Sequence, residues 1–188
     1  VINCAGLLVH ASDQSLNDAL LINAYVPKLL EASLARTQTK IIHISTDCVF
    51  SGLGKEPYLP YSLKDELGNY GLSKSIGEIC NQKDVTFRTS IIGPEIKKNG
   101  SGLLHWFLRE ESHLVHGWVN HHWNGITTIE LAYAILSEII EPRAVGIYNL
   151  VNNDFSCSKY ELLVNLKQVF SKEMQIVPVK NGIDKNKV

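Results

Sequence analysis

The chain has 188 residues, of which 45% are hydrophobic and 20% charged, and its formal net charge at pH 7 is −1. This composition is typical of a globular protein with one domain, or one domain and a small lobe, and no basic surplus points to nucleic acid. No apolar run approaches the roughly 18 residues of a membrane-spanning helix, and the first residues do not resemble a secretory signal, so we expect a cytoplasmic protein.

The first half of the chain alternates between strand-like and helix-like segments. Residues 1–6 form an apolar run that ends in small residues, and 40–45 and 84–90 are short strand-like runs. Residues 14–36 carry apolar side chains with the helical period, and 70–82 are interpreted as a second helix. Alternation of this kind predicts parallel β-α-β units, so we expect an α/β fold with a Rossmann-like doubly wound parallel sheet.

The second half has a more mixed pattern and predicts a smaller α/β lobe. Its segments are, in order, a short amphipathic piece at 103–108, a turn-rich section at 113–124, a helix at 128–140, a strand at 145–151, a helix at 158–170 with a serine cap, a strand at 176–179 and a polar tail at 180–187 that frays.

Cysteines and histidines do not have the spacing of a metal site. The four cysteines are Cys4, Cys48, Cys80 and Cys157, with no Cys-x-x-Cys pair, and we expect them to be reduced and mostly buried. Four of the seven histidines are close in sequence, namely His113, His116, His121 and His122. They lack the spacing of zinc motifs, so we expect no metal there and interpret the stretch as a polar loop over a site.

Tyr70 and Lys74 are the most informative pair of residues. Positions one helical turn apart share a helix face, so the phenol and the ammonium can point into one site. A free phenol has a pKa of about 10, and a nearby ammonium lowers it by stabilising the phenolate. Thr46 directly follows the strand over 40–45, and ligands of parallel sheets bind beyond such strand ends. The pair alone is also compatible with a solvated helix start and a snorkelling lysine.

Five segments together resemble the extended short-chain dehydrogenase/reductase superfamily, in the branch of the dTDP-4-dehydrorhamnose reductases and related sugar-nucleotide reductases. They are VINCAG at 1–6, ISTDCVFSG at 44–52, YGLSKSIGE at 70–78, RTSIIG at 88–93 and GITTIELA at 125–132. Each is common alone, but their combination in this order is specific, and the resemblance covers nearly the whole chain.

The resemblance implies reduction of a keto sugar by a nicotinamide cofactor, NADP or NAD. In it Tyr70 is the general acid, Lys74 adjusts the phenol and binds the nicotinamide ribose, and Thr46 orients the carbonyl oxygen. Residues 1–93 then belong to a Rossmann-like cofactor-binding domain and 94–188 to a smaller substrate-binding lobe, with segments around 125–152 returning to the main domain.

The resemblance also implies further cofactor-binding residues, and Asn23 as a helix residue that supports the site. The cofactor-binding set is Asn3, Ala5, Gly6, Ser45, Tyr70, Lys74, Thr89 and Ser90. The three tryptophans, Trp106, Trp118 and Trp123, are left between stacking on a ligand and packing in the lobe. Substrate choice is expected to depend on the loops at 53–68 and 113–124.

One part of the family pattern is absent from residues 1–188: the strand, Gly-x-x-Gly-x-x-Gly turn and helix that bind pyrophosphate. The chain opens at the family's fourth strand, so we expect about 60 residues of a family member to be missing. We interpret the chain as a fragment; the alternatives are a split protein completed by another segment, and a remnant that forms a homodimer. The expected ligand is a nucleotide-linked deoxy-sugar, with neither nucleic acid nor a membrane as partner.

The leading hypothesis is reduction of a 4-keto sugar nucleotide in surface polysaccharide synthesis. A sugar-nucleotide epimerase or dehydratase of the same superfamily is the alternative enzyme, and the Ser-Thr-Asp-Cys-Val-Phe segment favours the reductase. The third hypothesis is a non-catalytic, reductase-like regulatory subunit, which the intact Thr46, Tyr70 and Lys74 argue against.

Overall fold

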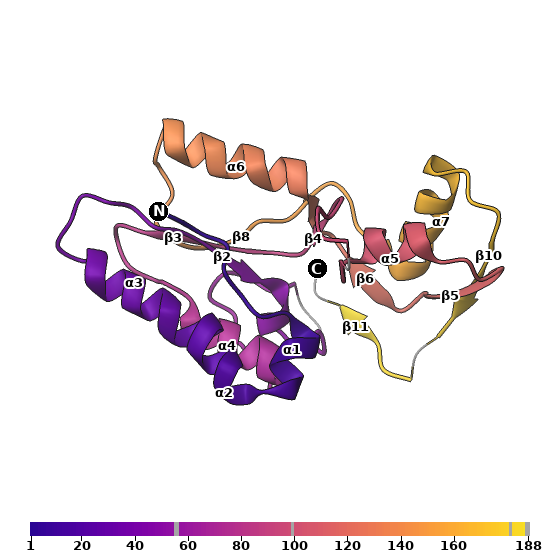
Figure 1. Ribbon diagram of the computed structural model, residues 1–188, viewed down its shortest axis with the longest axis horizontal. Coiled ribbons are helices and arrows are strands. Elements are labelled where there is room, and N and C mark those ends of the chain that lie inside the picture. The colour runs from indigo at the N-terminus through magenta and orange to yellow at the C-terminus, as the bar shows by residue number, and fades with distance from the viewer. Residues whose placement is uncertain (55–56, 99, 181, 187–188) are drawn as a thin grey trace. The chain divides into compact units, whose positions relative to one another are not determined.

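The computed structural model describes residues 1–54, 57–98, 100–180 and 182–186 (Figure 1). The strands are β1 (Ile2–Asn3), β2 (Ile42–Thr46), β3 (Val85–Thr89), β4 (Ile91–Ile92), β5 (Leu114–Trp118), β6 (His121–Trp123), β7 (Ile126–Thr127), β8 (Gly146–Asn149), β9 (Cys157–Ser158), β10 (Gln175–Val179) and β11 (Lys185–Asn186). The helices are α1 (Val9–Gln14), α2 (Leu16–Ala19), the π-helix η1 (Leu20–Tyr25), α3 (Val26–Leu34), the 3₁₀ helix η2 (Asp47–Val49), α4 (Asn69–Gly77), α5 (Leu103–Arg109), α6 (Thr128–Ile140) and α7 (Lys159–Val169).

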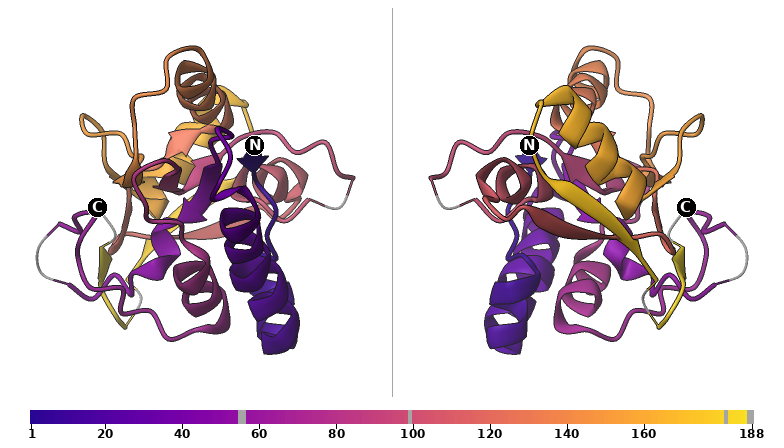
Figure 2. Two further views of the ribbon diagram at one scale, coloured as in Figure 1. Left: turned by 90° about the vertical axis from the view of Figure 1, so that its left-hand side faces the viewer. Right: turned by 90° about the vertical axis from the view of Figure 1, so that its right-hand side faces the viewer.

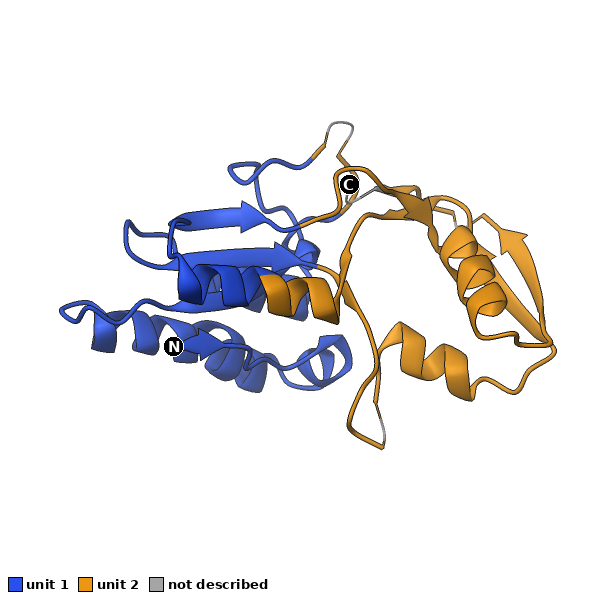
Figure 3. Cartoon of the chain, turned by 90° about the horizontal axis from the view of Figure 1, so that it is seen from above, with its two compact units in different colours: residues 1–51, 58–89, 134–150 blue, residues 52–57, 90–133, 151–188 orange. Residues whose placement is uncertain are grey.

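The chain divides into two compact units (Figure 3). The first unit consists of residues 1–51, 58–89 and 134–150, and the second of residues 52–57, 90–133 and 151–188. Among the described residues, none of the helices has the length and apolar character that a bilayer crossing requires.

The first unit contains a parallel sheet with the strand order β1-β2-β3-β8. This arrangement confirms the predicted α/β fold with a parallel sheet. The strand β1 lies at the edge of this sheet. Ile2 of β1 and Val1 before it are about half exposed, at 48% and 52%. The carboxyl ends of β2 and β3 are adjacent, because Thr46 pairs in register with Thr89.

The two faces of this sheet differ in polarity because side chains alternate along a strand. One face carries Ile42, Val85 and Phe87, which pack with Ile135 of α6 in an apolar cluster. The opposite face carries buried polar groups, among them Arg88, beneath α4. Figures 1 and 2 show α6 on one side of the sheet and α3 and α4 on the other. The polar side chains of this face therefore lie between the sheet and α4, the helix that carries Tyr70.

The helix predicted over 14–36 is divided into shorter pieces and begins earlier, at Val9. Ser15 starts a new piece, because its hydroxyl accepts a hydrogen bond from the backbone N–H of Asp18, as an N-cap does. The π-helical turn η1 lies where α4 comes closest. A Cβ on Gly77 of α4 would lie 1.9 Å from the carbonyl oxygen of Asn23. The packing of α4 against η1 therefore requires glycine at position 77. Nothing in the sequence near Gly77 indicates that these two helices come so close.

The helix predicted over 70–82 ends at Gly77. Directly beyond it, the backbone N–H of Ile79 donates to Oγ1 of Thr86 at 3.1 Å, and the same hydroxyl donates back to the carbonyl of Ile79 at 2.7 Å. These bonds to β3 replace helical ones, so the chain leaves the helix here.

The second unit has its own apolar core, formed by Phe107, Val115, Leu163 and Met174. Its helix α7 begins at a capping box in which Ser158 and Glu161 exchange hydrogen bonds, which confirms the predicted serine cap.

The prediction of a polar loop over 113–124 is wrong. This stretch forms β5, which pairs in parallel with β10, and β6. Its inward positions are Val115 and Gly117, and a Cβ on Gly117 would lie 2.6 Å from the Cα of Tyr160. Here glycine provides close packing in a strand, although by sequence alone it indicates a turn. His121 is buried with its ring 4.6 Å from that of Trp118.

Two smaller expectations also need correction. In the tail over 180–187, Lys185 and Asn186 form β11 and pair with β6, while Lys187 lies outside the described residues. Of the four cysteines, only Cys157 is buried, while Cys48 is half-buried and Cys4 and Cys80 are exposed. The prediction of mostly buried thiols is therefore wrong, because the other three lie in the loops and helix ends around the sheet.

Candidate active site

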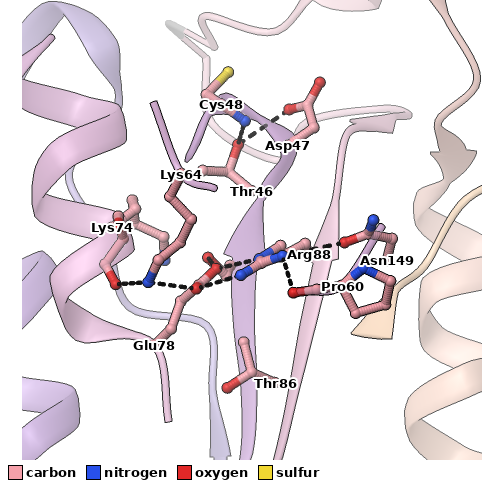
Figure 4. Close-up of polar contacts among 12 residues, drawn as sticks. Thr46, Asp47, Cys48, Pro60, Lys64, Lys74, Glu78, Thr86, Arg88 and Asn149 are labelled. Atoms are coloured by element: carbon pink, nitrogen blue, oxygen red, sulfur yellow. Dashed lines mark hydrogen bonds and ion pairs between the residues drawn. The ribbon is translucent and has the colours of Figure 1, made fainter. Parts of the chain in front are cut away.

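The carboxyl end of β2 brings Thr46 next to Tyr70 of α4. Thr46 is buried and begins η2, where its Oγ1 accepts a hydrogen bond of 3.1 Å from the backbone N–H of Cys48 and donates one of 3.2 Å to Asp47 (Figure 4). The Thr46 hydroxyl is near enough to the Tyr70 phenol to lower the pKa of that phenol. Lys74 follows Tyr70 by one helical turn and is buried. The three residues predicted to be catalytic thus lie at one end of the sheet.

Burial dominates the acidity of both residues on α4. It raises the pKa of Tyr70 to about 12, against the opposing effect of the nearby Thr46 hydroxyl. Burial also lowers the pKa of Lys74 to about 8, opposed by the negative charge of Glu78. The phenol is therefore protonated at neutral pH and has a proton to donate.

The expected lowering of the Tyr70 pKa by Lys74 is not seen in this structure. The ammonium of Lys74 instead donates a 2.7 Å hydrogen bond to the carbonyl of Ile44. Desolvation of the phenol is the largest contribution to its pKa, and Cys48 and Asp47 add to it.

The segment after β1 is held by side-chain amides. The Oδ1 atom of Asn3 accepts a hydrogen bond from the backbone N–H of Ala5 at 3.2 Å, and its Nδ2 lies 3.1 Å from Nδ1 of His43. A Cβ on Gly6 would lie 3.2 Å from Oδ1 of Asn23 and 3.8 Å from Nζ of Lys74. The backbone at Gly6 therefore runs directly beside the candidate site, where a side chain would crowd these polar atoms.

Asn23 connects this segment to α4. Its Oδ1 accepts from the backbone N–H of Leu7 at 2.8 Å, and its Nδ2 donates to the Leu7 carbonyl and to Ser73, at 3.1 and 3.0 Å. Ser73 in turn donates to the carbonyl of Tyr70 at 3.0 Å. The geometry is compatible with the supporting role that the sequence predicts for Asn23.

The remaining predicted cofactor residues lie at the ends of β2 and β3. Ser45 faces α4 and donates to Glu78 at 2.9 Å, so its hydroxyl belongs to the buried polar face. Thr89 is buried next to Thr46, and its Oγ1 has no hydrogen-bond partner among the described residues. Within the second unit, Ser90 accepts a 2.9 Å hydrogen bond from Nε1 of Trp123. For Trp123, this contact favours packing over stacking on a ligand.

Sequence reasoning missed a buried ion pair between Glu78 and Arg88. Arg88 is 3% exposed and Glu78 4% exposed. The available signals were the position of Glu78, one turn beyond Lys74 in the helical register, and an arginine inside a short apolar strand. Neither signal indicates that Glu78 and Arg88 pair with each other.

A surface cavity of about 420 Å³ lies elsewhere in the first unit. It is lined by Glu31, Ala35, Asn81, Gln82, Lys83 and Asp84. Asp84 directly precedes the amino end of β3, whereas the site residues are at the carboxyl ends. The cavity is therefore separate from the candidate site.

Comparison with known proteins places the chain in a family. The profile described as RmlD substrate binding domain matches residues 1–182. The spore coat polysaccharide biosynthesis protein SpsK of Bacillus subtilis is 28% identical in an alignment 189 positions long that covers 95% of this chain and 64% of SpsK. The dTDP-4-dehydrorhamnose reductase of Escherichia coli is 30% identical in an alignment 142 positions long that covers 71% of this chain and 47% of that enzyme. The chain thus spans less than two thirds of the length of these relatives.

Solved structures share the fold. A dTDP-4-dehydrorhamnose reductase from Clostridium acetobutylicum superposes with a TM-score of 0.83 at 24% identity, over 96% of this chain and 65% of its own. One from Bacillus anthracis, in complex with NADP, gives 0.82 at 24% identity, over 98% of this chain and 67% of its own.

Proposed function

The chain belongs to the RmlD substrate binding domain family, and on this premise we propose that it serves the NADPH-dependent reduction of a 4-keto sugar nucleotide. The observation that carries the proposal is the protonated, largely buried phenol of Tyr70 beside Thr46 at the end of β2, with Lys74 one turn further along α4. The relatives named as dTDP-4-dehydrorhamnose reductases and as a polysaccharide biosynthesis protein support a nucleotide-linked deoxy-sugar as the substrate and polysaccharide synthesis as the pathway.

The proposed mechanism uses Thr46 and Tyr70 to hold the carbonyl oxygen of the sugar. Tyr70 transfers its proton to this oxygen as negative charge develops on it. In this proposal Lys74 stabilises the phenolate that remains, which requires its ammonium to turn from the Ile44 carbonyl toward Tyr70. When bound, the nicotinamide cofactor supplies the hydride for the carbonyl carbon. The products are then the secondary alcohol and a phenolate, which takes up a proton to complete the cycle.

The residues around Lys74 fit the nicotinamide end of such a cofactor. The backbone at Ala5 and Gly6 is exposed and has no bulky side chain, so a ligand can approach it closely. The buried hydroxyl of Thr89, unpartnered among the described residues, is available to a polar group of a ligand. We propose that Asn3, Ala5, Gly6, Lys74 and Thr89 border the nicotinamide and its ribose. In the same proposal, Ser45 and Ser90 contribute at the neighbouring strand ends.

The test uses the full gene product that carries residues 1–188. It is incubated with dTDP-4-dehydrorhamnose and NADPH, and the nicotinamide absorbance is followed over time. The proposal predicts loss of absorbance that depends on the sugar, with a reduced sugar nucleotide as the product. A well-folded protein that binds both compounds without turnover would contradict reduction and favour a regulatory role.

A further inference from the structure

The ion pair of Glu78 and Arg88 is bidentate and almost completely buried. Nε of Arg88 donates to Oε1 of Glu78 at 2.6 Å and its Nη2 donates to Oε2 at 2.8 Å, as Figure 4 shows. Burying two charges costs more free energy than a well-packed apolar pair of the same size in many proteins. Stability alone is therefore a weak reason for this pair.

Glu78 is placed to act on the catalytic face of α4. Tyr70, Lys74 and Glu78 follow one another at intervals of four residues, so they share one side of the helix and its C-cap. The carboxylate also accepts a 2.9 Å hydrogen bond from Ser45, the residue before Thr46. One side chain therefore joins the end of α4 to the end of β2, the two elements that carry the proposed catalytic groups.

Arg88 and Lys64 extend this cluster to the segment that follows β2. Nη1 of Arg88 donates to the carbonyl of Pro60 at 2.9 Å. Nζ of Lys64 donates to Oε2 of Glu78 at 3.2 Å and to the carbonyl of Ser75 at 2.8 Å. The guanidinium also lies over the Phe50 ring, 5.0 Å from its centroid. The segment from Pro60 to Lys64 is thus attached to β3 and α4 through the ion pair.

We propose that Glu78 and Arg88 are positioning residues for the reduction: they fix the Tyr70 face of α4 against the end of β2, and Glu78 keeps Lys74 positively charged. This inference rests on the proposed function. The titratable groups around Lys74 are Glu78 at the C-cap of its own helix, Cys4 after β1 and His43 on β2. Tyr70 lies one turn before Lys74 on α4. His43 is held neutral by burial, which lowers its pKa to about 3, and burial raises the pKa of the Cys4 thiol. Glu78 is then the anion that opposes desolvation of the ammonium.

The kinetic test is Glu78→Gln in the full gene product, because glutamine keeps the shape and removes the charge. We expect kcat to fall on the order of 10- to 100-fold, with KM for the sugar nucleotide changed by less than about threefold. The alkaline decline of kcat is expected to move to lower pH, since Lys74 loses its proton more easily without the anion. An unchanged kcat with an unchanged pH profile would overturn the proposal.

The matched control is Glu138→Gln. Glu138 forms a partly buried ion pair of 3.0 Å with Lys40, and its side chain is 12% exposed. It also accepts hydrogen bonds from the backbone N–H groups of Arg143 and Ala144. Its partner Lys40 precedes the amino end of β2, whereas the site is at the carboxyl end of that strand. This variant is expected to lose stability without a change in the pH profile. A similar kinetic loss in both variants would assign the Glu78 effect to general destabilisation and contradict positioning.

A second measurement does not depend on turnover. The pKa of the Lys74 ammonium is determined by NMR with labelled lysine side chains, assigned by comparison with Lys74→Arg. It is expected to be lower in Glu78→Gln than in the wild type, and an equal value would refute the electrostatic part of the proposal. If the wild type does not turn over, the reductase proposal fails while this titration still decides the role of Glu78.

Arg88→Lys separates geometry from charge, and it replaces Glu78→Gln if that variant does not fold. Lysine keeps the positive charge but cannot form the bidentate contact. We expect a reduced kcat with a Lys74 pKa like that of the wild type. A wild-type kcat in this variant would contradict the need for the bidentate geometry.

Discussion

The ammonium of Lys74 donates a hydrogen bond of 2.7 Å to the carbonyl oxygen of Ile44, two residues before Thr46 on β2. Lys74 is only 5% exposed, so its ammonium is largely removed from water and has few polar neighbours in exchange. Helix α4 is joined to β2 through this bond, at the cost of burying a cation. The proposed function and stability therefore make opposite demands on Lys74.

Lys74→Met is expected to abolish reduction and to stabilise the fold. The folded pKa of about 8 lies below the ordinary value of 10.5, so below pH 8 the full cost of burying the charge is present. Between these values the unfolded chain binds more protons and wild-type stability rises with pH. At pH 7 we expect a gain on the order of 1–3 kcal/mol in the free energy of unfolding, measured by urea titration. Lys97→Met, at an exposed side chain, is the control and should change stability by less than about 0.5 kcal/mol. A Lys74→Met protein less stable than the wild type would contradict this account.

The rate of reduction is expected to fall as pH rises through about 8. Lys74 loses its charge in this range, whereas Tyr70, with its pKa raised to about 12, keeps its proton. The decline is therefore assigned to the lysine, and a pH profile of kcat between 6 and 10 measures it. A rate that stays constant up to pH 10 would argue against a role for the charged ammonium.

Acidification is expected to destabilise the fold through His43. Burial lowers the pKa of His43 to about 3, so the folded protein keeps it neutral while the unfolded chain protonates it near pH 6.5. Its contribution to stability is present above pH 6.5 and is lost as pH falls toward 3. Between pH 6.5 and 4.5 the wild type should lose about 2–3 kcal/mol more than His43→Gln does. The control is the exposed His116, changed to Gln, which should behave like the wild type. Equal losses in the wild type and His43→Gln would disprove the assignment.

Gly77→Ala is expected to destabilise the first unit by about 2–4 kcal/mol. The new Cβ would lie 1.9 Å from the carbonyl oxygen of Asn23. The nearest atoms are all backbone atoms of Asn23 and Ala24, so no flexible side chain can move away to relieve the clash. Gly182→Ala is the matched control, because nothing lies within 4 Å of its added Cβ. Urea titrations of both variants measure the difference, and similar midpoints would show that α4 and η1 are not so closely packed.

The sequence predicts those features that depend on local periodicity. The bounds of α6 over 128–140 follow from its helical period, and the parallel sheet follows from alternating strand and helix segments. The spacing of Tyr70 and Lys74 likewise places both on one helix. These features need only the geometry of a single element, or of consecutive elements.

Other features depend on contacts between distant segments and have no local signal. The hydrogen bonds of Thr86 to Ile79 end α4 early, and the close approach of Gly77 to Asn23 accompanies the π-helical turn. The pairing of Glu78 with Arg88 depends on both residues facing the same polar side of the sheet. Spacing along the chain does not reveal such cross-element partners.

The central claim is that the protein reduces a 4-keto sugar nucleotide with the proton of Tyr70. The most direct test supplies the full gene product with dTDP-4-dehydrorhamnose and NADPH deuterated at the transferring position, and analyses the product by mass spectrometry and NMR. We predict one deuterium at the former carbonyl carbon, and a loss of rate of about 10²- to 10⁴-fold in Tyr70→Phe with the fold intact. A product without deuterium at that carbon, or an unaffected rate in Tyr70→Phe, would contradict the account.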